Sequence, residues 1–476
     1  MIGRASDLAR FKRCIDDATG RNAVIAIAQA GAAYVEDARG GCGHAAAFVA
    51  PRSTEEVSLV LRTAAECGIR LIPQGANTGL VAAGVPEDAT ADVVLSLRAM
   101  NRRPSIDVAN RSACVEAGVR LSTLNSVAAD AGLCFPIDLA ADPSVGGLIA
   151  ANAAGAKFLR YGDVRRNLLG LEVVLADGHG TVLDFMKPLW KNNTGIDLKQ
   201  LFVGSSGSLG VITRAVLALH PLPTVTVAAL LVPADHDAVV DALVALERCA
   251  GDALTAFEGM SGVAMQAAVD LVSSVRNPFE SGDVPEFAVL VELSGGPGES
   301  ETRLTELLAQ ALATLESHGR TRIADVLLGD PARLWALRHA IPDALRRRGR
   351  VIGCDVSVSR GQLAALRTRL IEAVRVTWPE VEICDFGHVG DGGLHFNLVW
   401  PRSAREPATG TFDAIRTQVF EIVVKEFGGA FSAEHGVGPR NAAYYRRFTG
   451  STALRLSASI QRALAPARIG RVDFGG

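Results

Sequence analysis

Two short histidine-containing motifs in the second half of the chain have residue types and spacings that suit metal binding or acid–base chemistry. The first is His388-Val-Gly-Asp-Gly-Gly-Leu-His395, which lies between the strand-like stretches EICDF and FNLVW. We interpret residues 390–393 as a hairpin loop, so that His388 opposes His395 on two antiparallel strands. Directly opposed residues have side-chain bases about 5 Å apart, which lets two imidazoles share one metal ion.

The second motif, Ser432-Ala-Glu434-His435-Gly436-Val-Gly438, puts a carboxylate beside a histidine between glycines that permit a tight loop. Asn397 projects from the same face as His395, because it lies two residues farther along the strand. Two histidines and a glutamate suit zinc or another divalent ion, and a further histidine could act as a base. The alternative is that each histidine is a hydrogen-bonded core residue, the more common role of a single histidine. We favour the site because three of the nine histidines lie in two glycine-framed motifs.

Three segments rich in glycine and small residues lie in the first half of the chain. They are PQGANTGLVAAGVP at 73–86, ADPSVGGLIAANAAGAKFLRYGD at 141–163 and LFVGSSGSLGVIT at 201–213. Small side chains let backbone N–H groups approach a phosphate closely. None of the segments matches the Gly-x-Gly-x-x-Gly or Walker A pattern. Each alone is more typical of a turn, but together they indicate a large phosphate-bearing cofactor whose identity the spacing leaves open.

The elements that must position these motifs change character near Pro221. Residues 45–73 predict a strand, a helix and a second strand, with a capping box from Ser53 to Glu56 and Gly68 at the helix end. Residues 171–184 predict a hairpin around the turn DGHG. After Pro221, strands at 224–233 and 286–294 alternate with helices at 235–251 and 300–319. This alternation predicts a split βαβ, ferredoxin-like second domain.

Composition excludes several classes of protein. At roughly 150 residues per domain, 476 residues suggest two or three domains, and 49% hydrophobic with 21% charged residues is typical of a globular chain. A net charge of −3 argues against a nucleic-acid-binding protein, which would need an excess of basic residues. The eight cysteines include no C-x-x-C pair, which disfavours a disulfide-rich scaffold. The first twenty residues lack the apolar core of a secretory signal, and no stretch of about 18 apolar residues predicts a membrane span. We therefore expect a cytoplasmic protein.

The motifs resemble those of the vanillyl-alcohol-oxidase/PCMH-type FAD oxidoreductases, within them the D-2-hydroxyacid dehydrogenase branch, which includes D-lactate and D-2-hydroxyglutarate dehydrogenases. The three glycine-rich segments are similar to the family's FAD segments, and HVGDGGLHFN and SAEHGVG to its metal and catalytic motifs. The resemblance extends from about Ala45 to Tyr445. It implies an α+β fold with a PCMH-type two-subdomain FAD-binding domain over residues 1–222. A ferredoxin-like substrate (cap) domain with the metal-binding hairpin would follow over 223–425, and the segment 426–476 would return to the FAD domain and complete the active site.

The resemblance also implies a role for each matching residue. Backbone groups of the first loop would hold the FAD pyrophosphate, and because that loop contains no histidine we expect non-covalent FAD. The implied FAD-binding residues are Pro73, Gln74, Gly75, Ala76, Asn77, Thr78, Gly79, Leu80, Pro136, Ser144, Gly147, Asn152, Gly155, Val211 and Ile212. The implied metal ligands are His388, His395 and Glu434, with His435 as catalytic base, Asn397 as substrate contact and Arg338 as partner of the substrate carboxylate.

Four positions depart from the family pattern. Pro342 and Gly353 stand where D-2-hydroxyglutarate dehydrogenases carry a threonine and a lysine, so a second substrate carboxylate loses two side-chain donors. Ser206 replaces an acidic residue of the third FAD segment, and Asn441 replaces a common lysine after the EHG motif.

These features together predict FAD-dependent oxidation of a small D-2-hydroxy acid, D-lactate or D-2-hydroxyglutarate, to the 2-oxo acid. A divalent metal, with zinc as first candidate, would activate the hydroxyl. A flavoprotein, quinone or cytochrome would accept the electrons, and a homodimer is one open possibility for assembly. Two alternatives remain: a metal-dependent hydrolase that uses the His/His/Glu site without flavin, and a flavin redox subunit without hydroxyacid activity.

Overall fold

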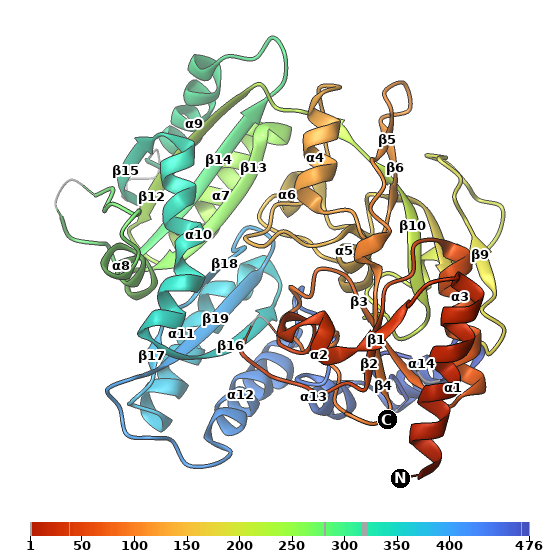
Figure 1. The fold of residues 1–476 in the computed structure, drawn as a ribbon. Helices are drawn as coiled ribbons and strands as arrows, with labels where there is room; N and C mark the ends of the chain where they lie inside the picture. Colours follow the sequence, from red (N-terminus) through yellow and green to blue (C-terminus); the bar gives the residue numbers. More distant parts are fainter. Residues whose placement is uncertain (1, 38, 280–281, 317–321, 468, 476) are drawn as a thin grey trace. The chain divides into compact units, whose positions relative to one another are not determined.

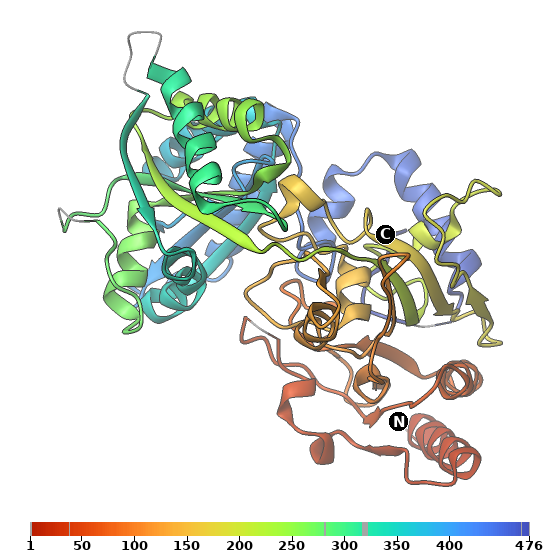
Figure 2. The ribbon, with the colours of Figure 1, turned by 90° about the horizontal axis from the view of Figure 1, so that it is seen from above.

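The structure is a computed structural model that describes residues 2–37, 39–279, 282–316, 322–467 and 469–475. Within these ranges the chain forms two compact units, shown in two views in Figure 1 and Figure 2. Unit 1 contains Met1–Ala153, Asp163–Leu222 and Glu434–Gly476, and unit 2 contains Ala154–Gly162 and Pro223–Ala433. None of the described helices is both long and apolar enough to cross a bilayer.

Unit 1 begins with a small sheet that carries the predicted strand–helix–strand arrangement. Its elements are α1 (Ile2–Thr19), β1 (Val24–Ala26), α2 (Ile27–Ala30), β2 (Ala47–Val49), α3 (Thr54–Glu66), β3 (Arg70–Gln74) and β4 (Asp92–Ser96). β2 and β3 are both parallel to β4, which lies between them. The Ser53 hydroxyl caps α3 by accepting a hydrogen bond from the Glu56 N–H. The other half of the predicted capping box is wrong, because the Glu56 carboxylate accepts from the N–H of Arg52.

A second, antiparallel sheet completes unit 1. Its strands are β5 (Ser105–Asp107), β6 (Ser112–Glu116), β8 (Leu168–Val174), β9 (Val182–Asp184) and β10 (Val211–Ala218). The rest of the unit contains the separate strand pair β7 (Leu133–Cys134) and β11 (His220–Pro221), and the helices α4 (Leu121–Ala129), α5 (Val145–Ala151), α13 (Ala442–Phe448) and α14 (Ser451–Leu464). The strand order is β5-β6-β10-β8-β9, and β8 and β9 form the predicted hairpin. Buried side chains of both sheets, including Leu71 and Val211, belong to one hydrophobic core. Ile469 forms a β-bridge with Leu71, which ties the C-terminal segment to this unit.

Unit 2 has the ferredoxin-like arrangement that the alternation of strands and helices predicts. Its first elements are α6 (Phe158–Tyr161), β12 (Val225–Pro233), α7 (Asp237–Ala250), β13 (Leu254–Ser261), α8 (Gly262–Leu271), β14 (Phe287–Gly295), α9 (Glu301–Glu316) and β15 (Ile323–Gly329). The strands are antiparallel in the order β15-β12-β14-β13. Residues 317–319 of the predicted second helix lie outside the described residues. The sequence did not predict β13, because every residue of that strand is buried and the apolar–polar alternation is lost.

The sheet of unit 2 continues beyond β13 and is covered on both faces. Its further elements are α10 (Pro331–Arg348), β16 (Gly349–Ser357), α11 (Leu363–Thr377), β17 (Glu382–Ile383), β18 (Phe386–Gly387), β19 (Gly393–Pro401) and α12 (Thr411–Glu421). The order continues β18-β19-β16, with β17 beside β19. On the face toward α8 and α10, Met260, Phe386 and Val399 share one core. On the opposite face α7 and α11 lie beside Phe287.

Candidate active site

The two hairpin histidines lie close together, but in a different register from the predicted one. Phe386, not His388, is the cross-strand partner of His395. His388 lies in the turn, where its carbonyl accepts hydrogen bonds from the N–H groups of Asp391 and Gly393 at 3.0 and 3.1 Å. The Asp391 carboxylate also accepts from the Gly393 N–H at 2.8 Å, which stabilises this longer turn. The two imidazole ring centres are nevertheless 5.1 Å apart.

Each of these imidazoles has a carboxylate beside its Nδ1 atom. His388 Nδ1 lies 2.6 Å from Glu258 Oε1, and His395 Nδ1 lies 3.3 Å from Asp355 Oδ1. The sheet explains both pairs: Asp355 is the cross-strand partner of His395, and the register of β13 with β18 leads from Glu258 to His388. An ionised carboxylate only accepts hydrogen bonds, so the contact with Glu258 favours the His388 tautomer with its proton on Nδ1, which leaves Nε2 as the atom suited to a metal. This set of donors fits a divalent ion of the zinc type.

Glu258 also binds Arg338, the residue expected to bind a substrate carboxylate. Nε and Nη2 of Arg338 lie 2.9 and 2.8 Å from Glu258 Oε2, and the guanidinium carbon lies 4.5 Å from the Phe386 ring centre. Both side chains are buried, with 6% of Arg338 and 1% of Glu258 exposed. Burial alone would raise the pKa of Glu258, but the charges of His388 and Arg338 and their hydrogen bonds lower this pKa to about 2. Glu258 is therefore an anion at neutral pH.

The three residues near Arg338 and His395 that bear on substrate binding have distinct positions. Asn397 lies two residues after His395 on β19, hence on the same face of the strand, and its cross-strand partner is Gly353. Pro342 lies inside α10, one turn after Arg338. Proline lacks the N–H that would donate to the Arg338 carbonyl in the helix. Neither Pro342 nor Gly353 has a side-chain donor for a substrate.

Glu434 and His435 follow a segment that is bonded to β16. The Ala433 N–H donates to the carbonyl of Asp355 at 3.2 Å. Ala433 is the last residue of unit 2, and Glu434 and His435 begin the last segment of unit 1. One peptide bond therefore joins Glu434 to a residue that is hydrogen-bonded to the backbone of Asp355.

In unit 1 the first glycine-rich segment contacts the other two. A Cβ atom at Gly75 would lie 1.9 Å from the Oγ of Ser144, in the second segment. A Cβ atom at Gly207, in the third segment, would lie 3.5 Å from the Cβ of Pro73. The close approach at Gly75 requires a residue without a side chain.

The second and third glycine-rich segments are joined by backbone hydrogen bonds. The Gly204 N–H donates to the Ile149 carbonyl at 3.0 Å, and the Ser206 N–H donates to the Ala150 carbonyl at 2.8 Å. Three segments that are distant in the sequence therefore meet through backbone and small side chains. This is the arrangement that a large phosphate-bearing cofactor needs.

The side chains of Gln74 and Asn77 support the first loop. Both amides donate to carbonyls of the segment 33–36, at distances of 2.6 to 3.0 Å, and Gln74 also donates to the Gly84 carbonyl at 2.8 Å. Asn77 has a left-handed backbone with φ of +57°. The buried Oε1 of Gln74 accepts no hydrogen bond from any described residue. A bound cofactor or a water molecule could satisfy this atom, which fits the expected FAD site.

Helix α5 carries several of the expected cofactor residues. The Ser144 hydroxyl accepts from the Gly147 N–H at 3.3 Å and caps the start of the helix, and Asn152 ends it with φ of +52°. The Asn152 amide donates to Asp163 Oδ2 at 2.8 Å and accepts from the Arg165 N–H at 3.0 Å. Asn152 thus has a structural role within unit 1, and its backbone is what it can offer a cofactor.

The remaining expected cofactor residues are spread over several elements. Val211 and Ile212 begin β10, and Pro136 is buried just after β7. Gly155 lies in the segment Ala154–Gly162, which belongs to unit 2. The structure brings together parts of the three glycine-rich segments, and the cofactor roles of Pro136, Val211, Ile212 and Gly155 remain sequence-based expectations.

Two of the departures from the family pattern hold the segment that follows His435. Ser206 Oγ donates to the Val437 carbonyl at 2.8 Å. Asn441 is buried, with 4% exposed, and its amide donates to the Gly436 carbonyl at 2.9 Å. Both residues thus fix the backbone of this glycine-rich segment within unit 1.

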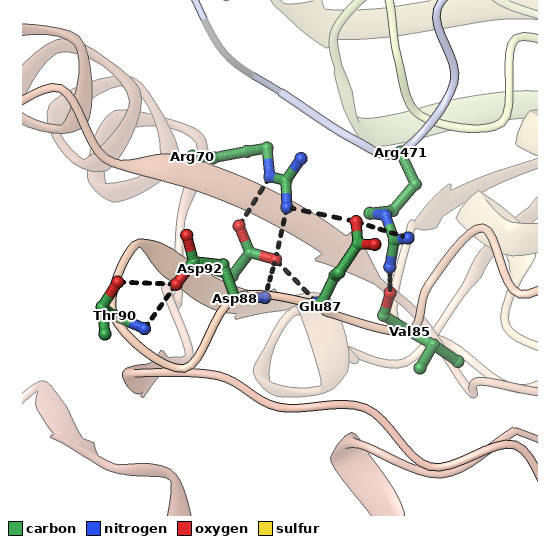
Figure 3. Close-up of polar contacts among 7 residues, drawn as sticks. All are labelled: Arg70, Val85, Glu87, Asp88, Thr90, Asp92 and Arg471. Atoms are coloured by element: carbon green, nitrogen blue, oxygen red, sulfur yellow. Dashed lines mark hydrogen bonds and ion pairs between the residues drawn. The ribbon is translucent and has the colours of Figure 1, made fainter. Parts of the chain in front are cut away.

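A polar network closes the base of the first loop (Figure 3). The buried carboxylate of Asp92 accepts from Arg70 Nε and Nη2 at 2.5 and 2.7 Å, and from the two backbone N–H groups of residues 87–88 at 2.7 and 3.0 Å. Arg471, from the C-terminal segment, donates to the Val85 carbonyl. Residues of three separate segments thus fix the point where the loop returns to the sheet.

Sequence reasoning missed Glu258 and Asp355. The signal that could have found Glu258 is a single acidic residue inside the otherwise uncharged run LTAFEGMS, and Asp355 is likewise the only charge in VIGCDVSV. A charged residue inside a buried strand is seldom there without a partner.

The comparisons with known proteins agree with this geometry. The family described as "FAD binding domain" matches residues 45–184, and the family described as "FAD linked oxidases, C-terminal domain" matches residues 222–469. The second match covers more than half of the chain. The chain belongs to the FAD-linked oxidases. This FAD-linked oxidase is therefore an FAD-dependent oxidoreductase.

The chain is also similar to named relatives and to solved structures. It is 35% identical to a probable mitochondrial D-2-hydroxyglutarate dehydrogenase of Oryza sativa subsp. japonica, over 89% of this chain and 74% of the relative. It is also 35% identical to a D-2-hydroxyglutarate dehydrogenase of Stutzerimonas stutzeri, over 82% of each. A 4-ethylphenol oxidase from Gulosibacter chungangensis has a TM-score of 0.73 at 20% identity, over 97% of this chain and 96% of that one. p-Cresol methylhydroxylase has a TM-score of 0.72 at 17% identity, over 97% and 95%. The last two comparisons confirm the PCMH-type α+β fold.

Proposed function

We propose that this FAD-linked oxidase oxidises the CH–OH group of a small D-2-hydroxy acid to a 2-oxo acid. The names of the rice and Stutzerimonas relatives support a D-2-hydroxy acid as substrate. The observation that carries the proposal is the contact of both Arg338 and His388 with Glu258, close to His395. It puts a guanidinium that can bind a carboxylate near two imidazoles that can bind a metal.

Two bound groups complete the proposal. FAD, held without a covalent bond, would supply the hydride acceptor, and the contacts among the three glycine-rich segments and the buried Gln74 Oε1 support its site. A divalent metal, for which zinc is the first candidate, would polarise the substrate hydroxyl. We assign His388, His395 and Glu434 as its ligands, and Asp355 adds a carboxylate beside His395.

Three side chains would bind the substrate and remove the proton of its 2-hydroxyl group. The Arg338 guanidinium binds the substrate carboxylate through hydrogen bonds and charge, and Asn397 contacts the substrate from the same face of β19 as His395. A ring nitrogen of His435 would accept the proton of the 2-hydroxyl, and bound FAD would supply the acceptor of the C2 hydride. A positioned base contributes about 10²- to 10⁴-fold to such a rate.

The identity of the acid is narrowed by the residues around Arg338. Pro342 and Gly353 offer no side-chain donor for a second carboxylate, which favours a monocarboxylate such as D-lactate. The relatives' names favour D-2-hydroxyglutarate instead. Both acids therefore belong in the same test.

The other parts of the proposal concern partners and location. We propose a flavoprotein, a quinone or a cytochrome as acceptor of the electrons, and a homodimer as a form of the protein to be tested. We also propose a cytoplasmic location, although the rice and bovine relatives are named as mitochondrial.

Two alternative functions compete with this proposal, and only one of them is argued against by the comparisons. A hydrolase without flavin would need the glycine-rich segments to be ordinary turns, and the match of residues 45–184 with an FAD-binding domain argues against that. A flavin redox subunit without hydroxyacid activity would hold flavin that no hydroxy acid reduces. Anaerobic mixing of the purified protein with D and L acids distinguishes this reading from ours.

A further inference from the structure

We infer that Glu258 is a positioning residue that holds the metal ligand His388 and the substrate-binding Arg338 in their working orientations. The inference rests on the proposed function, because that proposal assigns the two roles. One carboxylate serves both partners: Oε1 lies 2.6 Å from His388 Nδ1, and Oε2 lies 2.8 Å from Arg338 Nη2.

The contact with Oε1 sets the tautomer of His388. An ionised carboxylate accepts but cannot donate, so His388 keeps its proton on Nδ1 and can offer the lone pair of Nε2 to a metal. The same contact fixes the rotation of the ring about its side-chain bonds. Carboxylates in this position raise the basicity of a ligating histidine as well as orienting it.

The contact with Oε2 sets the direction of the Arg338 fork. Nε and Nη2 both bond to Oε2, and the guanidinium lies over the Phe386 ring at 4.5 Å. No described residue accepts a hydrogen bond from Arg338 Nη1. The fork is thus held on one edge by Glu258 while Nη1 stays available for an anionic group.

A purely structural role would not need this division of one carboxylate between two sites. Buried ion pairs contribute little net stability compared with well-packed apolar residues. The chain offers a matched comparison in Glu292, which is also buried, at 3% exposed, and lies on β14. Its carboxylate accepts from Trp335 Nε1 and from the Thr255 hydroxyl, both at 2.7 Å. Glu292 therefore ties the sheet to α10, as Glu258 does, but binds neither hairpin histidine.

The test compares Glu258→Gln with Glu292→Gln in the full-length flavoprotein. A glutamine can accept from His388 or from Arg338, but its amide N–H₂ then faces the other donor. Zinc affinity is measured on chelator-treated protein by competition with a colorimetric chelator, and KM and kcat are measured with the acid that reduces the flavin. We expect Glu258→Gln to bind zinc about 10- to 100-fold more weakly and to raise KM. We expect Glu292→Gln to keep zinc affinity within about twofold, because the Glu292 carboxylate bonds to Trp335 and Thr255 and to neither His388 nor Arg338.

A second readout is independent of bound metal and of activity. In metal-free wild-type protein, ¹⁵N NMR of labelled histidine should report His388 with its proton on Nδ1, with the signal assigned through a His388→Gln variant. Glu258→Gln should give a mixture of the two tautomers. If Glu258→Gln does not fold, Glu258→Asp takes its place, because it keeps the charge and shortens the side chain by one methylene.

The outcomes separate this inference from the proposed function. Unchanged zinc affinity and an unchanged tautomer in Glu258→Gln would overturn the inference, as would an equal loss in Glu292→Gln. Zinc affinity that depends on Glu258, in a protein whose flavin no acid reduces, would support the positioning of His388 and contradict the proposed function. Flavin reduction by a D acid in a wild-type protein that binds no zinc would support the proposed oxidation and contradict the positioning of His388 as a metal ligand.

Discussion

Arg70 and Asp92 form a two-pronged ion pair in which Nε lies 2.5 Å from Oδ1, Nη2 lies 2.7 Å from Oδ2, and Asp92 is completely buried (Figure 3). Exchanging Asp92 for Asn would leave Arg70 with only the longer ion pair to Glu87, at 3.9 Å. It would also turn the amide NH₂ toward either Arg70 or the N–H groups of residues 87–88, which are all donors. We expect Asp92→Asn to lower the free energy of unfolding by about 3 kcal/mol, because it breaks a buried pair. Urea unfolding of the FAD-free protein measures this change.

The neighbouring Asp88 provides the control for that prediction. Its carboxylate accepts from the N–H and the hydroxyl of Thr90 at 2.7 and 2.6 Å, near the surface. Asp88→Asn should cost about 1 kcal/mol or less, as expected for an ordinary hydrogen bond. Equal losses in the two variants would contradict a special role for the Arg70–Asp92 pair.

The same pair predicts a pH dependence of stability. Burial raises the pKa of Asp92, but the hydrogen bonds from Arg70 and from the backbone of residues 87–88 outweigh it and hold this pKa below 3.8. Asp92 therefore binds its proton more tightly in the unfolded state than in the folded state. The stabilisation from the ionised Asp92 is fully present above the unfolded-state pKa and is lost as pH falls through the folded-state pKa. The difference in unfolding free energy between wild type and Asp92→Asn should be constant from about pH 5 to 7 and shrink below about pH 4. A difference that shrinks as pH rises would contradict the assignment.

A substitution at Gly79 tests FAD binding without disturbing the fold. A Cβ atom there would meet no atom within 4 Å, so Gly79→Ala should change the stability of FAD-free protein by about 0.5 kcal/mol or less. If the pyrophosphate lies against this backbone, the added methyl should cost about 1 to 3 kcal/mol of binding, about a 5- to 150-fold weaker affinity for FAD. Flavin fluorescence titration measures this affinity.

Gly75→Ala is the matched variant in the same loop. Its methyl would collide with Ser144 Oγ even without FAD, so this variant should lose about 1 to 3 kcal/mol of stability. FAD affinity like that of wild type in Gly79→Ala would show that the pyrophosphate does not lie against this backbone.

His435 tests the acid–base step. We expect His435→Ala to retain FAD and metal and to lose about 10²- to 10⁴-fold in turnover, because the base is removed while the binding groups remain. Stopped-flow reduction of the flavin measures the loss. The control is His179→Ala, which changes an exposed histidine in the β8–β9 hairpin. Turnover within a few-fold of wild type in His435→Ala would remove this residue from the mechanism.

Local sequence signals predicted much of the fold. The Ser53 cap, Gly68 and the apolar runs around them were enough for β2, α3 and β3, and the turn residues 177–180 were enough for the β8–β9 hairpin. What such signals could not give is the order of strands in a sheet. β4 lies between β2 and β3 although it follows both in sequence, and its place depends on long-range packing.

The candidate site shows the same division. The closeness of His388 and His395 was predicted, but their register was wrong, because the turn is closed by Asp391 and Phe386 takes the position opposite His395. Glu258 was missed because it comes from β13, some 130 residues before His388 in the chain. Only the sheet order β13-β18-β19 brings these residues together.

The most direct test of the account is anaerobic mixing of the purified flavoprotein with D-lactate, D-2-hydroxyglutarate, D-malate and their L forms, with the visible flavin band recorded. The account predicts that one D acid bleaches the band and that its L form does not. A band that none of the acids bleaches would contradict the proposed oxidation of a D-2-hydroxy acid and leave the FAD-linked oxidase fold unaffected.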